Sequence, residues 1–185
     1  MIKIIIITYL FLFFTTFVKA DIKTEIILNL KKTQNLSFKF VQSINDKSEN
    51  GNCVIHYPKK IFCAYNNVNK KIMVSNGRSL VIKNNNINQY YIYPLKKTAL
   101  EFILDKDYLI KKIIDSEGRL IDNKYFNFTI FENKNQINIF FDAKNLNLVG
   151  WQMEDVYQNL IITFISSIKI NQKIDDSVFI LPQKN

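Results

Sequence analysis

The sequence predicts a mainly β protein, built as one antiparallel sheet of short strands with a few helices. Apolar and polar residues alternate in many short runs, which is typical of half-buried strands. Short polar segments join these runs, so neighbouring strands must run antiparallel. Helical spacing of apolar residues occurs only at the start of the expected domain and near its middle.

Composition and the N-terminus indicate an exported globular protein. The 185 residues carry a formal net charge of +9, and 48% are hydrophobic, a mixture typical of folded chains. A charged start, an apolar run from Ile4 to Val18 and small residues at Val18 and Ala20 resemble a secretory signal peptide. The run is shorter than the ~20 residues of a membrane-spanning helix. We therefore expect residues 1–20 to be a cleaved signal peptide, and residues 21–185 to form a single domain.

The expected elements follow in order along the chain. Ile22–Lys32 is predicted to be an amphipathic helix, and Thr98–Leu104 a short apolar helix in which Thr98 and Glu101 form a capping box. Asp107–Ser116 suits either a helix or a buried strand. The predicted strands are Leu36–Ile44, Gly51–Tyr57, Ile61–Tyr65, Lys71–Ser75, Leu80–Lys83, Ile87–Tyr93, Lys124–Phe131, Gln136–Phe141, Leu146–Met153 and Tyr157–Ile170, with Val178–Leu181 as a candidate last edge.

Two pairs of residues carry local information. Asn76-Gly77 is the strongest hairpin signal, because both residues tolerate positive φ. Cys53 and Cys63 flank the Tyr57–Lys60 turn at nearly equal distances, so a hairpin there would bring them onto neighbouring strands. In an oxidising compartment they are either a cross-strand disulfide or two buried thiols.

Signals for catalysis are missing from the sequence. His56 is the single histidine, and the chain has no Gly-rich phosphate loop, nucleophile elbow or metal-ligand spacing. We expect no cofactor, no metal site and no enzymatic activity. A lipid hydrolase is an alternative hypothesis, and an expected apolar pocket is its only support.

Charge and aromatic content leave alternatives open. The excess of lysine suits an anionic membrane surface, an acidic protein partner or simply a solvated surface, and nucleic acid is not expected for an exported protein. Aromatic residues make up 14% of the chain and fall mostly on predicted strands. A curved sheet lined by these rings either packs an ordinary core or leaves apolar space for an acyl chain.

The order and spacing of several short motifs resemble the LolA family, the periplasmic carriers of outer-membrane lipoproteins. No single motif is specific, but together they extend over nearly the whole expected domain. The motifs are Phe38–Gln42, Gly51, Tyr57-Pro58 followed by Tyr65, Val74–Gly77 followed by Leu80, Pro94–Leu104, Phe141-Asp142 with Leu146 and Leu148, Asp155 with Asn159, and Phe179 with Pro182.

The resemblance implies an open, half-closed antiparallel β-barrel with a helical lid over a hydrophobic cavity. The cavity would hold the acyl chains of lipoproteins, which a monomeric carrier takes from an inner-membrane ABC transporter and gives to an outer-membrane receptor. No covalent chemistry is implied. The alternative is a related periplasmic module on the same fold that binds lipid or lipoprotein, or senses envelope stress, without transfer.

Candidate site residues follow from the resemblance and the strand pattern together. The best-known family members carry an arginine before the hairpin proline that is thought to latch the lid, whereas Tyr57 stands there in this chain. Tyr57, Lys59 and Lys60 are therefore the latch candidates, and none has the bidentate fork of a guanidinium group. The cysteine pair is not expected from the family. The residues expected to contact lipid are Phe40, Tyr91, Tyr93, Leu100, Ile103, Leu104, Phe126, Phe128, Phe141 and Trp151.

Overall fold

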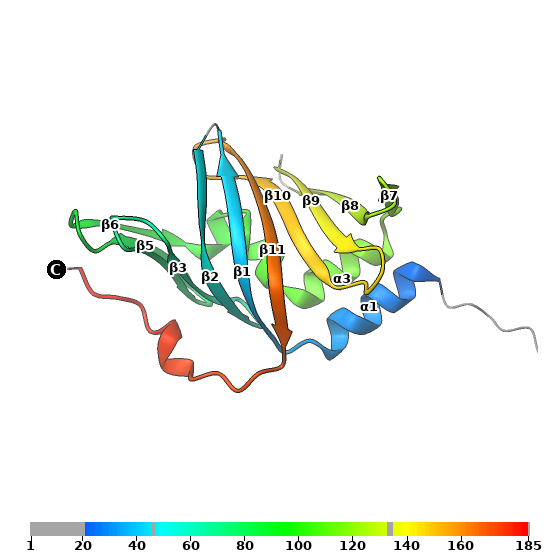
Figure 1. The fold of residues 1–185 in the computed structure, drawn as a ribbon, viewed down its shortest axis with the longest axis horizontal. Helices are drawn as coiled ribbons and strands as arrows, with labels where there is room; N and C mark the ends of the chain where they lie inside the picture. The colour runs from blue at the N-terminus through cyan, green and yellow to red at the C-terminus, as the bar shows by residue number, and fades with distance from the viewer. Residues whose placement is uncertain (1–20, 46, 133–134, 185) are drawn as a thin grey trace, which may run out of the picture.

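A single curved sheet forms the body of the protein (Figure 1). The computed structural model describes residues 21–45, 47–132 and 135–184, so the predicted signal peptide lies outside the described residues. Eleven antiparallel strands are ordered β6-β5-β4-β3-β2-β1-β11-β10-β9-β8-β7, and the end strands β6 and β7 do not pair. The strands are β1 (Asn35–Ile44), β2 (Lys47–His56), β3 (Lys60–Tyr65), β4 (Lys71–Asn76), β5 (Ser79–Asn84), β6 (Gln89–Pro94), β7 (Arg119–Ile121), β8 (Tyr125–Glu132), β9 (Asn135–Asp142), β10 (Leu148–Glu154) and β11 (Leu160–Ile170).

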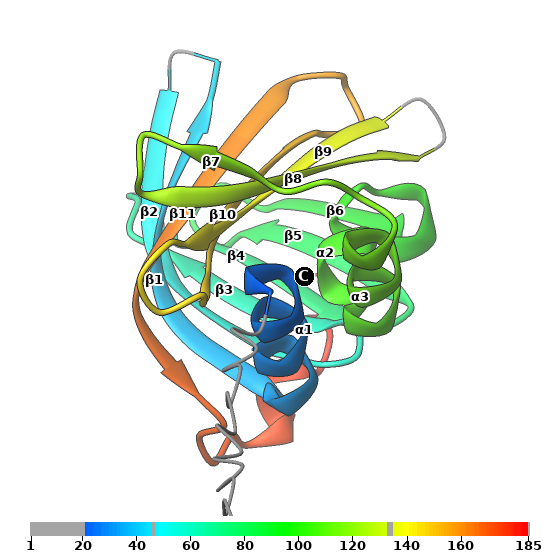
Figure 2. The same cartoon turned by 90° about the vertical axis from the view of Figure 1, so that its right-hand side faces the viewer.

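Three helices lie across the concave side of this sheet (Figure 2). They are α1 (Ile22–Lys32), α2 (Leu100–Leu104) and α3 (Lys106–Ile114). Their apolar side chains join the inward-facing strand residues in one buried core. The predicted open antiparallel half-barrel with helices over its hollow is thus confirmed. In the part of the chain that the structure describes, no helix is long and apolar enough to cross a membrane.

Alternation along the strands decides which side chains enter the hollow. On β1, Phe38, Phe40 and Gln42 are buried, whereas Lys39 and Val41 are exposed. Gly51 on β2 lies opposite Phe40. A Cβ at Gly51 would come within 2.1 Å of the Ala64 carbonyl oxygen, so only glycine allows the strands to pass here.

Two hairpins position the region around Pro58. Cys53 and Cys63 face each other on β2 and β3, with Cα atoms 4.1 Å apart, and a disulfide joins them. The neighbouring β4–β5 hairpin turns at Gly77, whose φ is 96°, and the Asn76 side chain accepts hydrogen bonds from the amides of Arg78 and Ser79. The Asn76-Gly77 hairpin prediction is confirmed.

Three details differ from the sequence-based expectation, and one alternative that the sequence left open is decided. Val178–Leu181 is not an edge strand, because a 3-10 turn at Asp176–Phe179 packs on β3 and β4 and buries Phe179 instead. The capping box does not form, since the Thr98 hydroxyl donates to the Leu95 carbonyl and α2 begins after Ala99 without a side-chain cap. Asp107–Ser116 resolves as helix α3. Strand β7 was not expected.

Candidate functional site

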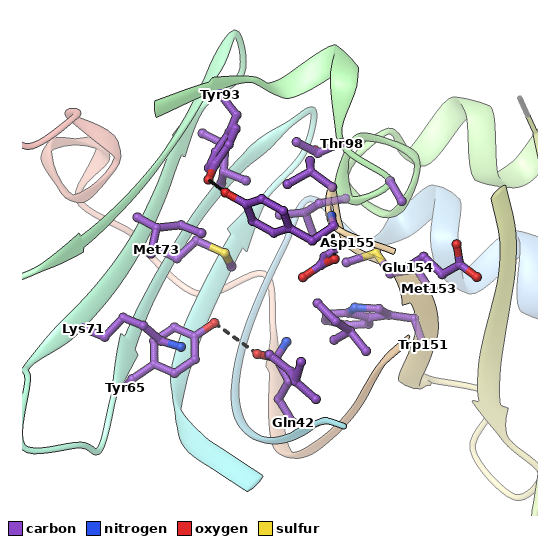
Figure 3. A pocket seen from close by; sticks show the side chains of 18 residues that line it. Gln42, Tyr65, Lys71, Met73, Tyr93, Thr98, Trp151, Met153, Glu154 and Asp155 are labelled. Carbon is purple, nitrogen blue, oxygen red and sulfur yellow. Dashed lines mark hydrogen bonds between the residues drawn. The ribbon is translucent and has the colours of Figure 1, made fainter. Parts of the chain in front are cut away.

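A cavity of about 170 Å³ lies under α2. Strands β1, β3, β4, β5 and β6 line it together with β10, β11 and the loop between these two strands (Figure 3). Its wall is mainly apolar, with a few polar side chains at its floor and mouth. The lining residues are Gln42, Ile44, Tyr65, Lys71, Met73, Leu80, Ile82, Tyr93, Thr98, Ala99, Leu100, Trp151, Met153, Glu154, Asp155, Val156, Tyr157 and Ile161. Ligand pockets usually measure roughly 300–1,000 Å³. This cavity therefore has room for only part of a lipid while α2 stays in place.

Helix α2 covers the cavity, and Lys59 contacts acidic side chains on this helix and directly after it. The Lys59 ammonium nitrogen lies 3.0 Å from a carboxylate oxygen of Glu101 and 3.2 Å from one of Asp105. The backbone amide of Lys59 also donates to the Leu104 carbonyl over 2.8 Å. The hydrogen bonds that the Lys59 ammonium group donates to Glu101 first, and then to Asp105, raise the pKa of Lys59 above its ordinary value. The turn after Pro58 is thus tied to α2 through both side chain and backbone.

Ser75 fixes the same turn through two hydrogen bonds of its hydroxyl group. Its buried hydroxyl donates to the Lys59 carbonyl over 3.0 Å and accepts from the Gly77 amide over 3.1 Å. Ser75 belongs to the hairpin motif at Val74–Gly77, so this motif supports the position of Lys59. Ser75 thus connects the β4–β5 hairpin to the turn that contacts α2.

The other two latch candidates make different contacts. Tyr57 is buried, burial raises the pKa of its hydroxyl, and its oxygen has no hydrogen-bond partner among the described residues. The Lys106 ammonium group of α3 lies 5.8 Å from the centre of the Tyr57 ring. Lys60 pairs with Asp176 and lies over the Phe179 ring, at the C-terminal 3-10 turn.

Two tyrosines meet at the mouth of the cavity. The hydroxyl oxygens of Tyr93 on β6 and Tyr157 in the β10–β11 loop are 3.2 Å apart. Tyr93 is labelled at this end of the cavity in Figure 3. This hydrogen bond raises the pKa of Tyr93 to about 12. Asp155 shapes the loop, because its carboxylate accepts from the amides of Tyr157 and Asn159. The Asp155 and Asn159 motif therefore places Tyr157 across the opening.

The floor of the cavity carries a short polar chain. The Tyr65 hydroxyl donates to the Gln42 carbonyl oxygen over 3.4 Å, and the Gln42 amide donates to the Thr163 hydroxyl over 3.1 Å. The Lys71 ammonium group lies 3.8 Å from the centre of the Tyr65 ring and pairs with Glu49. These groups satisfy one another, so they add polarity to the site without an open charge.

The predicted lipid-contacting residues fall into three groups. Tyr93, Leu100 and Trp151 line the cavity. Five residues are buried away from it, namely Phe40, Ile103, Leu104, Phe128 and Phe141, while Phe126 is half-buried and Tyr91 is 42% exposed. Phe40 stacks edge to face on Tyr65, with ring centres 4.9 Å apart, and Phe128 meets Phe141 in the same way at 5.9 Å.

Several lining residues were not among the candidates. Gln42, Met73 and Met153 lie on predicted strands, and period-two alternation could have placed them on the inner face. Tyr157 was expected to start a strand, yet it lies in the loop before β11. Its role depends on the distance to Tyr93 across the fold, which local sequence does not contain.

A comparison with known protein families shows to which family the chain belongs. Residues 31–181 match the family described as "Outer membrane lipoprotein carrier protein LolA". The chain belongs to the LolA family. The comparison with curated proteins gave no match. In the described part of the chain, no three His, Cys, Asp or Glu side chains gather as a metal site would require.

Solved structures with a similar fold have low sequence identity to this chain. A LolA superfamily protein from Nitrosomonas europaea is 10% identical, with a TM-score of 0.41 over 85% of this chain and 96% of that chain. A DUF1329 family protein from Desulfovibrio piger is 10% identical, with a TM-score of 0.46 over 86% and 94%. The MucA/MucB complex of Pseudomonas aeruginosa gives 11% identity and a TM-score of 0.48 over 84% of this chain and 59% of that chain.

Proposed function

We propose that this protein is a periplasmic carrier that binds the acyl chains of lipoproteins and shuttles them from the inner to the outer membrane. It would receive them from an inner-membrane ABC transporter and give them to an outer-membrane receptor. Membership of the LolA family supports this proposal. The observation that carries it is an apolar cavity whose roof, α2, is held by one ion-pair cluster.

The closed cavity explains how a carrier can release its cargo. Each buried methylene contributes ~0.8 kcal/mol, so several acyl chains bound in a preformed space would be held too tightly to leave. Here α2 contributes Leu100, Ile103 and Leu104 to the core, and all three are at most 5% exposed. A lipid must displace this packing and the Lys59 contacts. The closed lid therefore competes with the cargo and lowers its net affinity.

The test is release of a labelled lipoprotein from inner-membrane vesicles that contain the transporter. Wild-type protein should release it, and Leu100→Asp should not, because the variant places a charge in the apolar roof. Ile180→Asp is the matched control, since Ile180 is 72% exposed and should release normally. Equal release by Leu100→Asp and wild type would refute the assignment of the roof.

A second step separates the carrier from the binding module that does not transfer. Released lipoprotein is mixed with vesicles that carry the outer-membrane receptor, and its movement into them is measured. A carrier delivers the lipoprotein. A protein that binds the lipoprotein and keeps it would instead be the sensing or binding module.

A further inference from the structure

The Trp151 side chain lines the cavity and also packs in the hydrophobic core. It lies on β10 opposite Ile139 and Thr163, and the side chain is 4% exposed. Phe38 meets the indole edge to face, with ring centres 6.3 Å apart. Figure 3 shows the indole among the side chains that enclose the cavity.

The indole nitrogen of Trp151 is a buried donor without an acceptor. Nε1 is fully buried and makes no hydrogen bond to any described residue. An indole N–H can only donate, and a buried donor without a partner destabilises the protein. The Gln42 carbonyl oxygen, a polar group of the same cavity, accepts from the Tyr65 hydroxyl and not from the indole. A buried N–H donor without a partner, in the wall of a binding cavity, indicates that the ligand supplies the acceptor.

The position of the donor along β10 limits what the acceptor can be. Along the chain, Trp151 comes two residues before Met153 and four before Asp155, and all three line the cavity (Figure 3). Beyond it are fully buried apolar side chains such as Ile139 and Phe128. An acyl chain offers one strong acceptor, the carbonyl oxygen that joins it to its head group. This carbonyl oxygen lies between the polar head group and the apolar chain of a lipid. Trp151 lies in a matching position, between the polar mouth of the cavity and the apolar core of the protein.

We propose that the Trp151 indole N–H donates a hydrogen bond to the linkage carbonyl of an acyl chain, an ester or amide oxygen. The cavity then receives the linkage region, and the chain runs under α2 into the core. The site therefore selects acylated ligands over alkyl chains without a carbonyl. This inference rests on the proposed function, because it requires acyl chains to enter beneath the lid.

The test uses the fact that Trp151 is the only tryptophan in the chain. A ¹⁵N-labelled sample therefore shows one indole N–H signal in its NMR spectrum, and a hydrogen bond to a carbonyl moves the proton downfield. Three probes are titrated: a short-chain diacyl phosphatidylcholine, its dialkyl ether analogue, which lacks the carbonyl groups, and a diacylated lipopeptide. The ester should move the signal downfield and bind roughly three- to tenfold more tightly than the ether.

Two variants separate the hydrogen bond from the packing. Trp151→Phe keeps a ring but removes the donor, so the preference for ester over ether should fall below about twofold. Phe131→Leu is the control, because Phe131 is 71% exposed and does not line the cavity, and this variant should keep the full preference. Displacement of a fluorescent apolar probe measures affinity in all variants. The wild-type NMR experiment stands even if Trp151→Phe fails to fold.

The outcomes are distinct. A shift with the lipopeptide alone supports the inference and assigns the carbonyl to a lipoprotein, whereas a shift with the phospholipid alone supports it and assigns the carbonyl to a phospholipid. Equal shifts with ester and ether, or a preference that survives in Trp151→Phe, overturn the inference while lipid binding stands. Absence of binding by all three probes overturns the proposed function as well.

Discussion

The proposed latch at Lys59 gives the sharpest quantitative prediction. Lys59→Met keeps the aliphatic stem and removes the charge that Glu101 and Asp105 share. The three side chains are 32%, 20% and 27% exposed, so each ion pair contributes at most about 1 kcal/mol after solvent screening. Two pairs around one cation give about 1–2 kcal/mol. The open state of α2 should therefore become roughly five- to thirtyfold more populated.

Hydrogen exchange measures this opening residue by residue. In Lys59→Met, protection of the amides of residue 59 and Asp105 should fall about tenfold, because these amides bond to the Leu104 and Glu101 carbonyls. Amides at the centre of β1 and β11 should be unchanged. Lys60→Met is the matched control, since Lys60 pairs with Asp176 and not with α2. Unchanged protection of α2, or an equal loss across the sheet, would refute the latch.

Three further predictions concern the framework and the latch. Gly51→Ala should lower the melting temperature by several degrees, because overpacking against the Ala64 carbonyl costs about 1–3 kcal/mol; an unchanged melting curve would contradict this. Reduction of the Cys53–Cys63 bond should lower the free energy of unfolding by about 2–3 kcal/mol in urea titrations, and the Cys53→Ala/Cys63→Ala variant should show no effect of reductant. The ion pairs of Lys59 should persist from neutral pH up to 10.5 and weaken as the pH rises through the raised pKa of Lys59. The difference in entry of the fluorescent probe between wild type and Lys59→Met should therefore vanish at high pH, and a difference that survives would count against the ion pairs.

Much of the fold could be predicted because its signals are local. The first helix begins and ends as predicted, at Ile22 and Lys32, and the strand pattern follows the alternation of side chains. Strand β7 escaped because its three residues, Arg119–Ile121, are too few to show a period. The tail at Val178–Leu181 has the composition of a strand. However, it packs on β3 and β4, which already have paired strands on both sides. The Asp175 carboxylate accepts a hydrogen bond from the Ser177 amide, and a 3-10 turn begins there.

The site was harder to predict because it depends on what covers each part of the sheet. Alternation shows that Phe128 and Phe141 share the concave face, yet it does not show that the helices fill this half of the hollow. Those rings consequently pack in the core, while Trp151 lines the cavity. The pairing of Lys59 with α2 and of Tyr93 with Tyr157 spans 42 and 64 residues. Contacts at such separations follow from topology rather than from local sequence.

The central claim is that the acyl chains of lipoproteins enter beneath α2. Site-specific photocrosslinking in cells tests it directly, with a photoreactive amino acid at position 100 in the roof and, as control, at position 180 on the exposed C-terminal segment. After labelling of lipoproteins with radioactive palmitate, position 100 should capture a labelled lipoprotein and position 180 should not. Absence of capture at position 100, or equal capture at both positions, would contradict the account.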